Sequence, residues 1–142
     1  MISFTDRELR KAWRENLEAS QNNNQTKNPK NLLLFYATEC GLKAVVLKND
    51  GNSLTDESSI IKDAGHNLKE LMRYLHIDGQ FKLPRYLELN SVRRKGKKQE
   101  RGAAIRDLNQ VWRYGGKLPL EINEQIEEKL TEINDWIKES LL

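Results

Sequence analysis

One stretch constrains the fold more than any other, NLLLFYATECGLKAVVLKND, because a helix built from it is apolar almost all round. Such a helix needs other elements to cover each of its sides. Asn28-Pro29 is a typical helix start and Asp50-Gly51 a typical helix end, so we expect one central helix between them. Gly41 lies inside it at a cost of about 1 kcal/mol relative to alanine, which indicates the close approach of another helix.

Four other segments have the capping residues or apolar spacing of helices. Thr5 and Glu8 form a capping box that starts the first of them. The segment RYLELNSV is ambiguous between a short helix and an extended link. The predicted helices are residues 6–20, residues 66–78, residues 99–114 and a long segment after Pro119 with a stripe of Ile122, Ile126, Leu130, Ile133 and Ile137.

The length of 142 residues predicts a single domain, residues 1–142, of the all-α class. We expect an up-down bundle of four main helices plus short helical pieces. Residues 1–27 would hold the N-terminal helix and a polar loop, and residues 90–100 an exposed basic loop. No apolar run approaches the roughly 20 residues that cross a bilayer. No signal-peptide core is present either, so we expect a cytoplasmic protein without a membrane partner.

Metal and cofactor chemistry receive little support from the sequence. Cys40 is the only cysteine, which excludes an internal disulfide and a cysteine-based zinc site. Two histidines without a compact set of carboxylates do not make a metal site. The chain has no Walker loop and no G-x-G-x-x-G motif. We therefore expect neither a metal nor a cofactor.

Charge is distributed unevenly although the formal net charge is only +3. Residues 91–117 are strongly basic, and acids dominate from Glu121 onward, which polarises the field of the molecule. Phosphate backbones favour basic clusters because their binding releases counterions. The alternative is a solvated face and a mobile loop. The candidate nucleic-acid-binding residues are Arg93, Arg94, Lys95, Lys97, Lys98, Arg106, Arg113 and Tyr114.

The segment GHNLKELMRYLHI contains both histidines of the chain. On a helix, His66 and Arg73 point away from the leucine stripe, and His76 lies at its border. A histidine can move a proton and an arginine can hold a phosphate, so these three residues are candidate catalytic residues. The alternatives are a capping or packing role for His66 and a partly buried structural role for His76.

Glu39 and Lys43 are spaced i, i+4 on the central helix, in the order that stabilises a helix. One interpretation is a simple helix-stabilising ion pair. If the two side chains are buried together, they instead form a candidate polar network beside a site.

Three stretches together resemble the HEPN family of small all-α domains: LLLFYATECGLKAVVLKN, GHNLKELMRYL and LNQVWRYGGKLP. The pattern E-C-G-L-K-A from Glu39 to Ala44 carries the resemblance best. G-H-x-L-x-x-L from Gly65 to Leu71 and the pair Arg113-Tyr114 support it. The resemblance covers residues 28–141. It implies a helical bundle, often dimeric, in toxin–antitoxin, anti-phage defence or RNA-processing systems.

Many members of that family are metal-independent ribonucleases whose arginine and histidine are separated by four to six residues. Here only two residues separate Arg73 from His76. We therefore expect first a module that binds nucleic acid, with RNA favoured, or a nucleotide, through its basic face. The second hypothesis is a metal-independent ribonuclease with a non-standard Arg/His centre. The third is a non-catalytic subunit that binds a protein partner in a defence or toxin–antitoxin complex. A homodimer is expected from the resemblance.

Overall fold

The long helix α2 (Lys27–Asp50) lies at the centre of the fold in the computed structural model. Most of its circumference is buried, and the consecutive residues Ala44, Val45 and Val46 are all shielded from solvent. This confirms the central helix that the sequence predicts. The structure describes residues 2–22, 24 and 26–142.

The two ends of α2 have different local causes. Gly51 takes the left-handed conformation, with φ of 70°, and its N–H caps the last turn. Glycine adopts this conformation without a steric cost, so the predicted end is confirmed. At the other end Thr26, not Asn28, precedes the first turn. The side-chain amide of Asn28 instead donates to the carbonyl oxygen of Gly116 at 3.2 Å.

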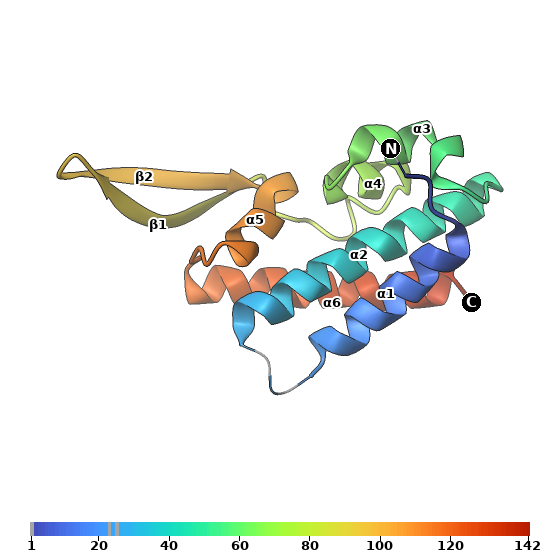
Figure 1. Cartoon of the computed structure of the whole chain (residues 1–142), viewed down its shortest axis with the longest axis horizontal. Coiled ribbons are helices and arrows are strands. Elements are labelled where there is room, and N and C mark those ends of the chain that lie inside the picture. Colours follow the sequence, from blue (N-terminus) through green and yellow to red (C-terminus); the bar gives the residue numbers. More distant parts are fainter. Residues whose placement is uncertain (1, 23, 25) are drawn as a thin grey trace.

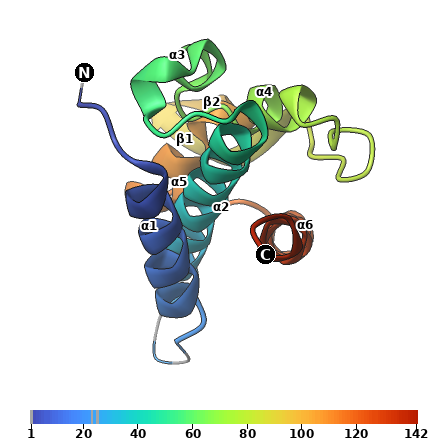
Figure 2. The ribbon, with the colours of Figure 1, turned by 90° about the vertical axis from the view of Figure 1, so that its right-hand side faces the viewer.

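Two further long helices, α1 (Asp6–Ser20) and α6 (Leu120–Ser140), pack against α2. α1 lies alongside α2, whereas α6 is inclined to both and is seen end-on where α1 is seen lengthwise (Figures 1 and 2). The predicted capping box is present, with the N–H of Glu8 donating to Thr5 Oγ1 at 3.1 Å and the N–H of Thr5 donating to Glu8 Oε1 at 3.0 Å. In the described part of the chain, no helix is both long and apolar enough to cross a membrane.

Short helices follow α2, and only the last of them, residues 68–74, falls within residues 66–78, where the sequence predicts one helix. This helix ends early because His76 takes a left-handed φ of 61°. The N–H of Ile77 donates to the carbonyl of Met72 at 3.0 Å, and that of His76 to the carbonyl of Arg73 at 3.1 Å. These two bonds form the Schellman motif that terminates helices. The short helices are η1 (Thr55–Glu57), α3 (Ser59–Ala64) and α4 (Leu68–Tyr74).

An antiparallel β-hairpin replaces two predicted elements. Its strands are β1 (Tyr86–Arg94) and β2 (Lys97–Ala104). The predicted basic loop over residues 90–100 is therefore wrong, although residues 93–100 are exposed as expected. The predicted helix over residues 99–114 is wrong in its first part. What remains of it is the helical pair η2 (Ile105–Asp107) and α5 (Leu108–Arg113).

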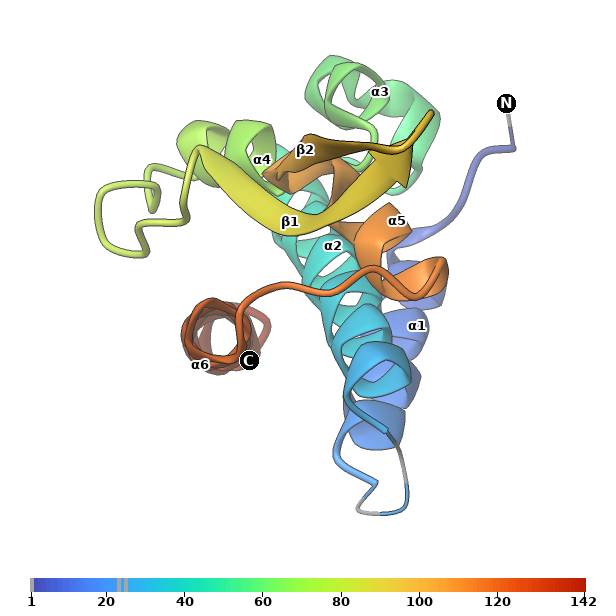
Figure 3. The ribbon, with the colours of Figure 1, turned by 90° about the vertical axis from the view of Figure 1, so that its left-hand side faces the viewer.

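The hairpin projects from the helical body as an arm (Figure 1), and it stands in front of the helices when the molecule is viewed from that side (Figure 3). Its base is fixed by burial, since Leu87 of β1 and Ala103 of β2 are both buried. Its tip is the two-residue turn of Lys95 and Gly96, with φ of 52° and 76°. Two consecutive positive φ values are typical of the type I′ turn, whose twist matches that of a hairpin.

Gly41 has the role that the sequence indicates. A Cβ atom at this position would lie 2.8 Å from side-chain atoms of Ile137 on α6 and Trp13 on α1. We expect Gly41→Ala to destabilise the protein by about 1–2 kcal/mol, because overpacking outweighs the gain of about 1 kcal/mol in helix propensity. Urea denaturation measures this change, and a variant more stable than the wild type would contradict the close packing.

Candidate functional site

Side chains from two distant segments meet at Glu39 on α2. One carboxylate oxygen of Glu39 lies 2.6 Å from Nδ1 of His66, and the other lies 3.0 Å from Nζ of Lys43. The side chains of Glu39 and Lys43 are only 11% and 14% exposed, whereas that of His66 is 59% exposed. A buried carboxylate is costly unless it is hydrogen-bonded, and here both oxygens have a charged or polar partner.

Of the two interpretations of Glu39 and Lys43, the structure shows the buried polar network. His66 joins it from the turn between α3 and α4, where Gly65 takes a φ of 55°. A carboxylate that accepts Nδ1–H orients the imidazole and leaves Nε2 available for a ligand. The i, i+4 spacing on an apolar helix was the sequence signal for the pair, whereas no local signal connected it to His66.

The other two candidate catalytic residues have different surroundings. Arg73 donates from Nη1 to Glu70 Oε1 at 3.0 Å within α4. His76 is exposed at the end of α4, so the expectation of partial burial is wrong. Among the described residues, no hydrogen bond or ion pair joins Arg73 or His76 to His66. A catalytic role for these three residues stays a prediction.

The basic tip comprises Arg93 to Lys98 without Gly96, that is, five cations on the exposed end of the hairpin. The strand register places Arg93 opposite Lys98 and Arg94 opposite Lys97. Like charges directly across two strands destabilise a hairpin. In the described chain the one ion pair formed by these cations joins Lys98 to Glu100 at 3.5 Å. The tip is therefore a concentrated positive charge that a polyanion would stabilise.

The remaining candidate binding residues lie away from the tip. Arg106 on η2 has Asp107 within 3.8 Å. Arg113, at the end of α5, lies over the ring of Tyr36 on α2, with Cζ 5.8 Å from the ring centroid, and donates to the hydroxyl of Tyr36. Hydrogen bonds to Tyr114 and Tyr36 raise the pKa of the Arg113 guanidinium. The side chain of Tyr114 is exposed. Tyr36 was not predicted, because its partner comes from a distant segment.

The described residues contain no group of three or more histidine, cysteine, aspartate or glutamate side chains placed to hold a metal ion. The chain matches no family model, no curated protein and no solved structure. The candidate sites in the described part of the chain are the basic tip and the polar network around Glu39.

Proposed function

We propose that this protein binds nucleic acid through the basic tip of its hairpin. The observation that carries the proposal is the cross-strand register, which sets Arg93 against Lys98 and Arg94 against Lys97 at an exposed end. Folding alone gains nothing from this arrangement, because like charges repel across a strand pair. Phosphate groups would relieve the repulsion and release counterions on binding.

The shape of the arm bears on the kind of nucleic acid. Beyond the pair of Leu89 and Arg101, the hairpin continues for six residues to Lys95, on the order of 20 Å. A two-stranded ribbon fits the major groove of B-form DNA, whereas the major groove of A-form RNA is too deep and narrow for side chains to read. Single-stranded RNA, which the family resemblance favours, would instead be bound through its own phosphate backbone. Both ligands belong in the test.

We also propose that the helices form a HEPN-like bundle. It is supported by the bond between Glu39 and His66, because these residues come from the two sequence patterns that carry the resemblance. The up-down order of four main helices, a homodimer and a setting in a toxin–antitoxin or defence complex also stay proposals. Two alternative functions stay open in this setting, a metal-independent ribonuclease and a subunit that binds a protein partner.

Binding by the wild-type protein should depend steeply on salt. If each of the five cations of the tip meets one phosphate, the slope of log K against log [salt] is about −4.5 on duplex DNA, at about −0.9 per phosphate, and about −3.5 on a single strand. Affinity for DNA would then fall about 500-fold between 50 and 200 mM salt. Fluorescence anisotropy with labelled single-stranded RNA, duplex RNA and duplex DNA measures both slopes.

The same samples, kept in EDTA and resolved on a denaturing gel, report cleavage. Intact RNA together with salt-dependent binding supports a binding module. Cleavage that His66→Ala abolishes would support the ribonuclease alternative. A lack of binding to all three ligands at 50 mM salt would refute the proposal and favour the protein-interaction subunit.

A further inference from the structure

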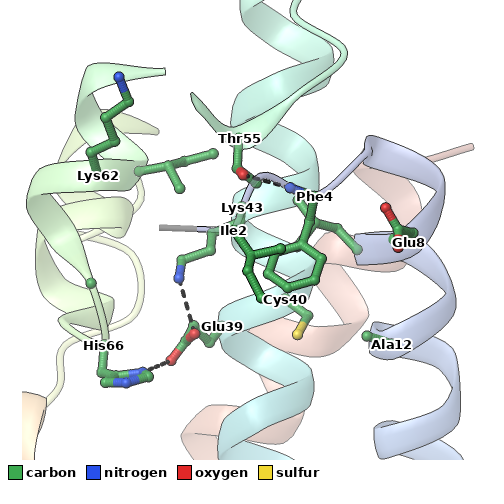
Figure 4. Close-up of a pocket in the computed structure, with 13 residues that line it drawn as sticks. Ile2, Phe4, Glu8, Ala12, Glu39, Cys40, Lys43, Thr55, Lys62 and His66 are labelled. Carbon is green, nitrogen blue, oxygen red and sulfur yellow. Dashed lines mark hydrogen bonds and ion pairs between the residues drawn. The ribbon is translucent and has the colours of Figure 1, made fainter. Parts of the chain in front are cut away.

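A cavity of about 410 Å³ lies between α1, α2 and α3, beside the polar network of Glu39. Its volume falls within the range of roughly 300–1,000 Å³ that is usual for small-molecule sites. Figure 4 shows Phe4, Cys40 and Ala12 along one side and the polar network at the other end. Ile61 of α3 and Leu9 of α1 complete an apolar lining. An apolar cavity with a few convergent polar groups is the usual form of a binding site.

The N-terminal segment is fixed across this cavity by hydrogen bonds to Ser53 and Thr55. The N–H of Phe4 donates to Thr55 Oγ1 and the N–H of Thr55 to the carbonyl of Phe4, both at 2.9 Å. The N–H of Asp6 donates to the carbonyl of Ser53 at 3.0 Å. The segment therefore has a defined place as a wall of the cavity. Phe4 itself is 44% exposed although it is a large apolar residue, as expected for a side chain that lines an open cavity.

The polar end of the cavity does not carry a net negative charge. The carboxylate of Glu39 is balanced by the ammonium of Lys43, and its other oxygen is bonded to Nδ1 of His66. Lys62 also lines the cavity and has no ion-pair partner among the described residues. The second carboxylate of the lining, Glu8, is bonded to Thr5 at the start of α1, on the side of the cavity away from Glu39 and His66 (Figure 4). An anionic group at this end would meet the ammonium of Lys43, which has further N–H donors besides the one that Glu39 accepts, whereas a cationic group would compete with Lys43 for that carboxylate.

We propose that this cavity binds a small amphipathic organic anion, with its apolar body against Phe4, Ala12 and Cys40 and its anionic head at the ammonium of Lys43. The site is separate from the basic tip, and nucleic-acid binding is not needed for it. Octanoate represents this class of ligand. Octanol and octylamine have the same chain with a neutral and a cationic head, so they test the charge of the head group.

Cys40 offers a direct reporter, because it is the only cysteine of the chain and lines the cavity. Burial, reinforced by the charge of Glu39, raises the pKa of the Cys40 thiol to about 11. The free protein should therefore react slowly with iodoacetamide at pH 8.5, as a mostly protonated thiol. Octanoate at ten times its Kd should slow the reaction by about tenfold, as measured by mass spectrometry of the intact chain.

The head-group claim is tested by Lys43→Met, which removes the cation and keeps the length of the side chain. We expect it to weaken octanoate binding by about tenfold or more and to leave octanol binding unchanged. Lys27→Met is the matched control, since Lys27 lies on the same helix and pairs with Glu124 at 3.5 Å, away from the cavity. It should bind octanoate like the wild type.

A second variant tests the cavity itself. Ala12→Trp places an indole in the space, so Cys40 should be protected without a ligand and octanoate should add nothing. An unchanged alkylation rate of the wild type in octanoate would overturn the proposal. So would equal protection by octylamine, because it would show that the site does not select an anion.

Discussion

Neutralising the five cations of the basic tip should lower the affinity for nucleic acid by roughly 10²–10⁴-fold at 100 mM salt and flatten the salt slope toward zero. The variant combines Lys95→Asn with glutamine at the other four cations. Asparagine is suited to the left-handed φ of 52° at Lys95, and Gly96 stays, so the type I′ turn is preserved. The substituted residues are Arg93, Arg94, Lys95, Lys97 and Lys98.

The matched control removes five exposed cations from the helical body. Both variants change the formal net charge by five units, from +3 to −2, so any difference between them comes from position and not from total charge. The control should keep most of the salt slope of the wild type. The control residues are Arg7, Lys11, Arg14, Lys82 and Lys138, all of which are exposed.

The tip variant should also be at least as stable as the wild type, because it removes two pairs of like charges that face each other across the strands. Thermal unfolding checks this point and shows that any loss of binding is not a loss of folding. Equal affinity of the tip variant and the wild type would refute the proposed function. Equal losses in both variants would show a diffuse effect of charge and would also refute it.

The long helices could be predicted because local rules and burial agree there. Thr5 and Glu8 form the capping box, and Gly51 takes the left-handed conformation, as the sequence indicates. The stripe on α6 is buried at Ile126 and at Leu130. Each of these features is readable within one or two turns of the chain, so tertiary structure did not need to be known.

The hairpin could not be predicted because its two sequence signals, the alternation of apolar residues and the turn residues, are both weak. Leu87 and Leu89 alternate, but a β-bulge after Leu89 adds a residue to β1, so the same face continues at Val92 and not at position 91. A period of two is therefore broken in the middle of the strand. The turn is Lys95-Gly96, which is a weaker hairpin signal than Asn-Gly or Asp-Gly.

The candidate site was predictable only in parts, since each part lies on a different element. The charged pair of Glu39 and Lys43 was visible as an i, i+4 pair on an apolar helix. His66 could be named as a candidate residue from the sequence, but without its partner. The bond between His66 and Glu39 spans 27 positions, and it depends on how α3 and α4 fold back onto α2. Such a contact is set by packing, which a single sequence does not show.

Asn134→Leu should destabilise the protein by about 2–4 kcal/mol although it replaces a polar core residue by an apolar one of similar size. Asn134 is buried on α6 and accepts a hydrogen bond from Nε1 of Trp13 at 3.0 Å. It also donates to Thr38 Oγ1 at 2.8 Å and to the carbonyl of Leu130. The substitution leaves the indole N–H of Trp13 buried without an acceptor, which costs about 1–3 kcal/mol in addition to the lost bonds.

Urea denaturation with an unchanged m-value measures the loss, and Asn49→Leu on the exposed end of α2 is the control, expected within about 0.5 kcal/mol. Combining Asn134→Leu with Trp13→Phe removes the orphaned donor, so the double-mutant cycle should show a coupling of about 1–2 kcal/mol. Additive losses would contradict the hydrogen-bond account. The same arrangement recurs where Nε1 of Trp112 donates to Asn123 at 3.1 Å. Two buried asparagines on α6 thus each hold a tryptophan from a different element, which fixes the position of α6 along the core more strictly than its apolar stripe can.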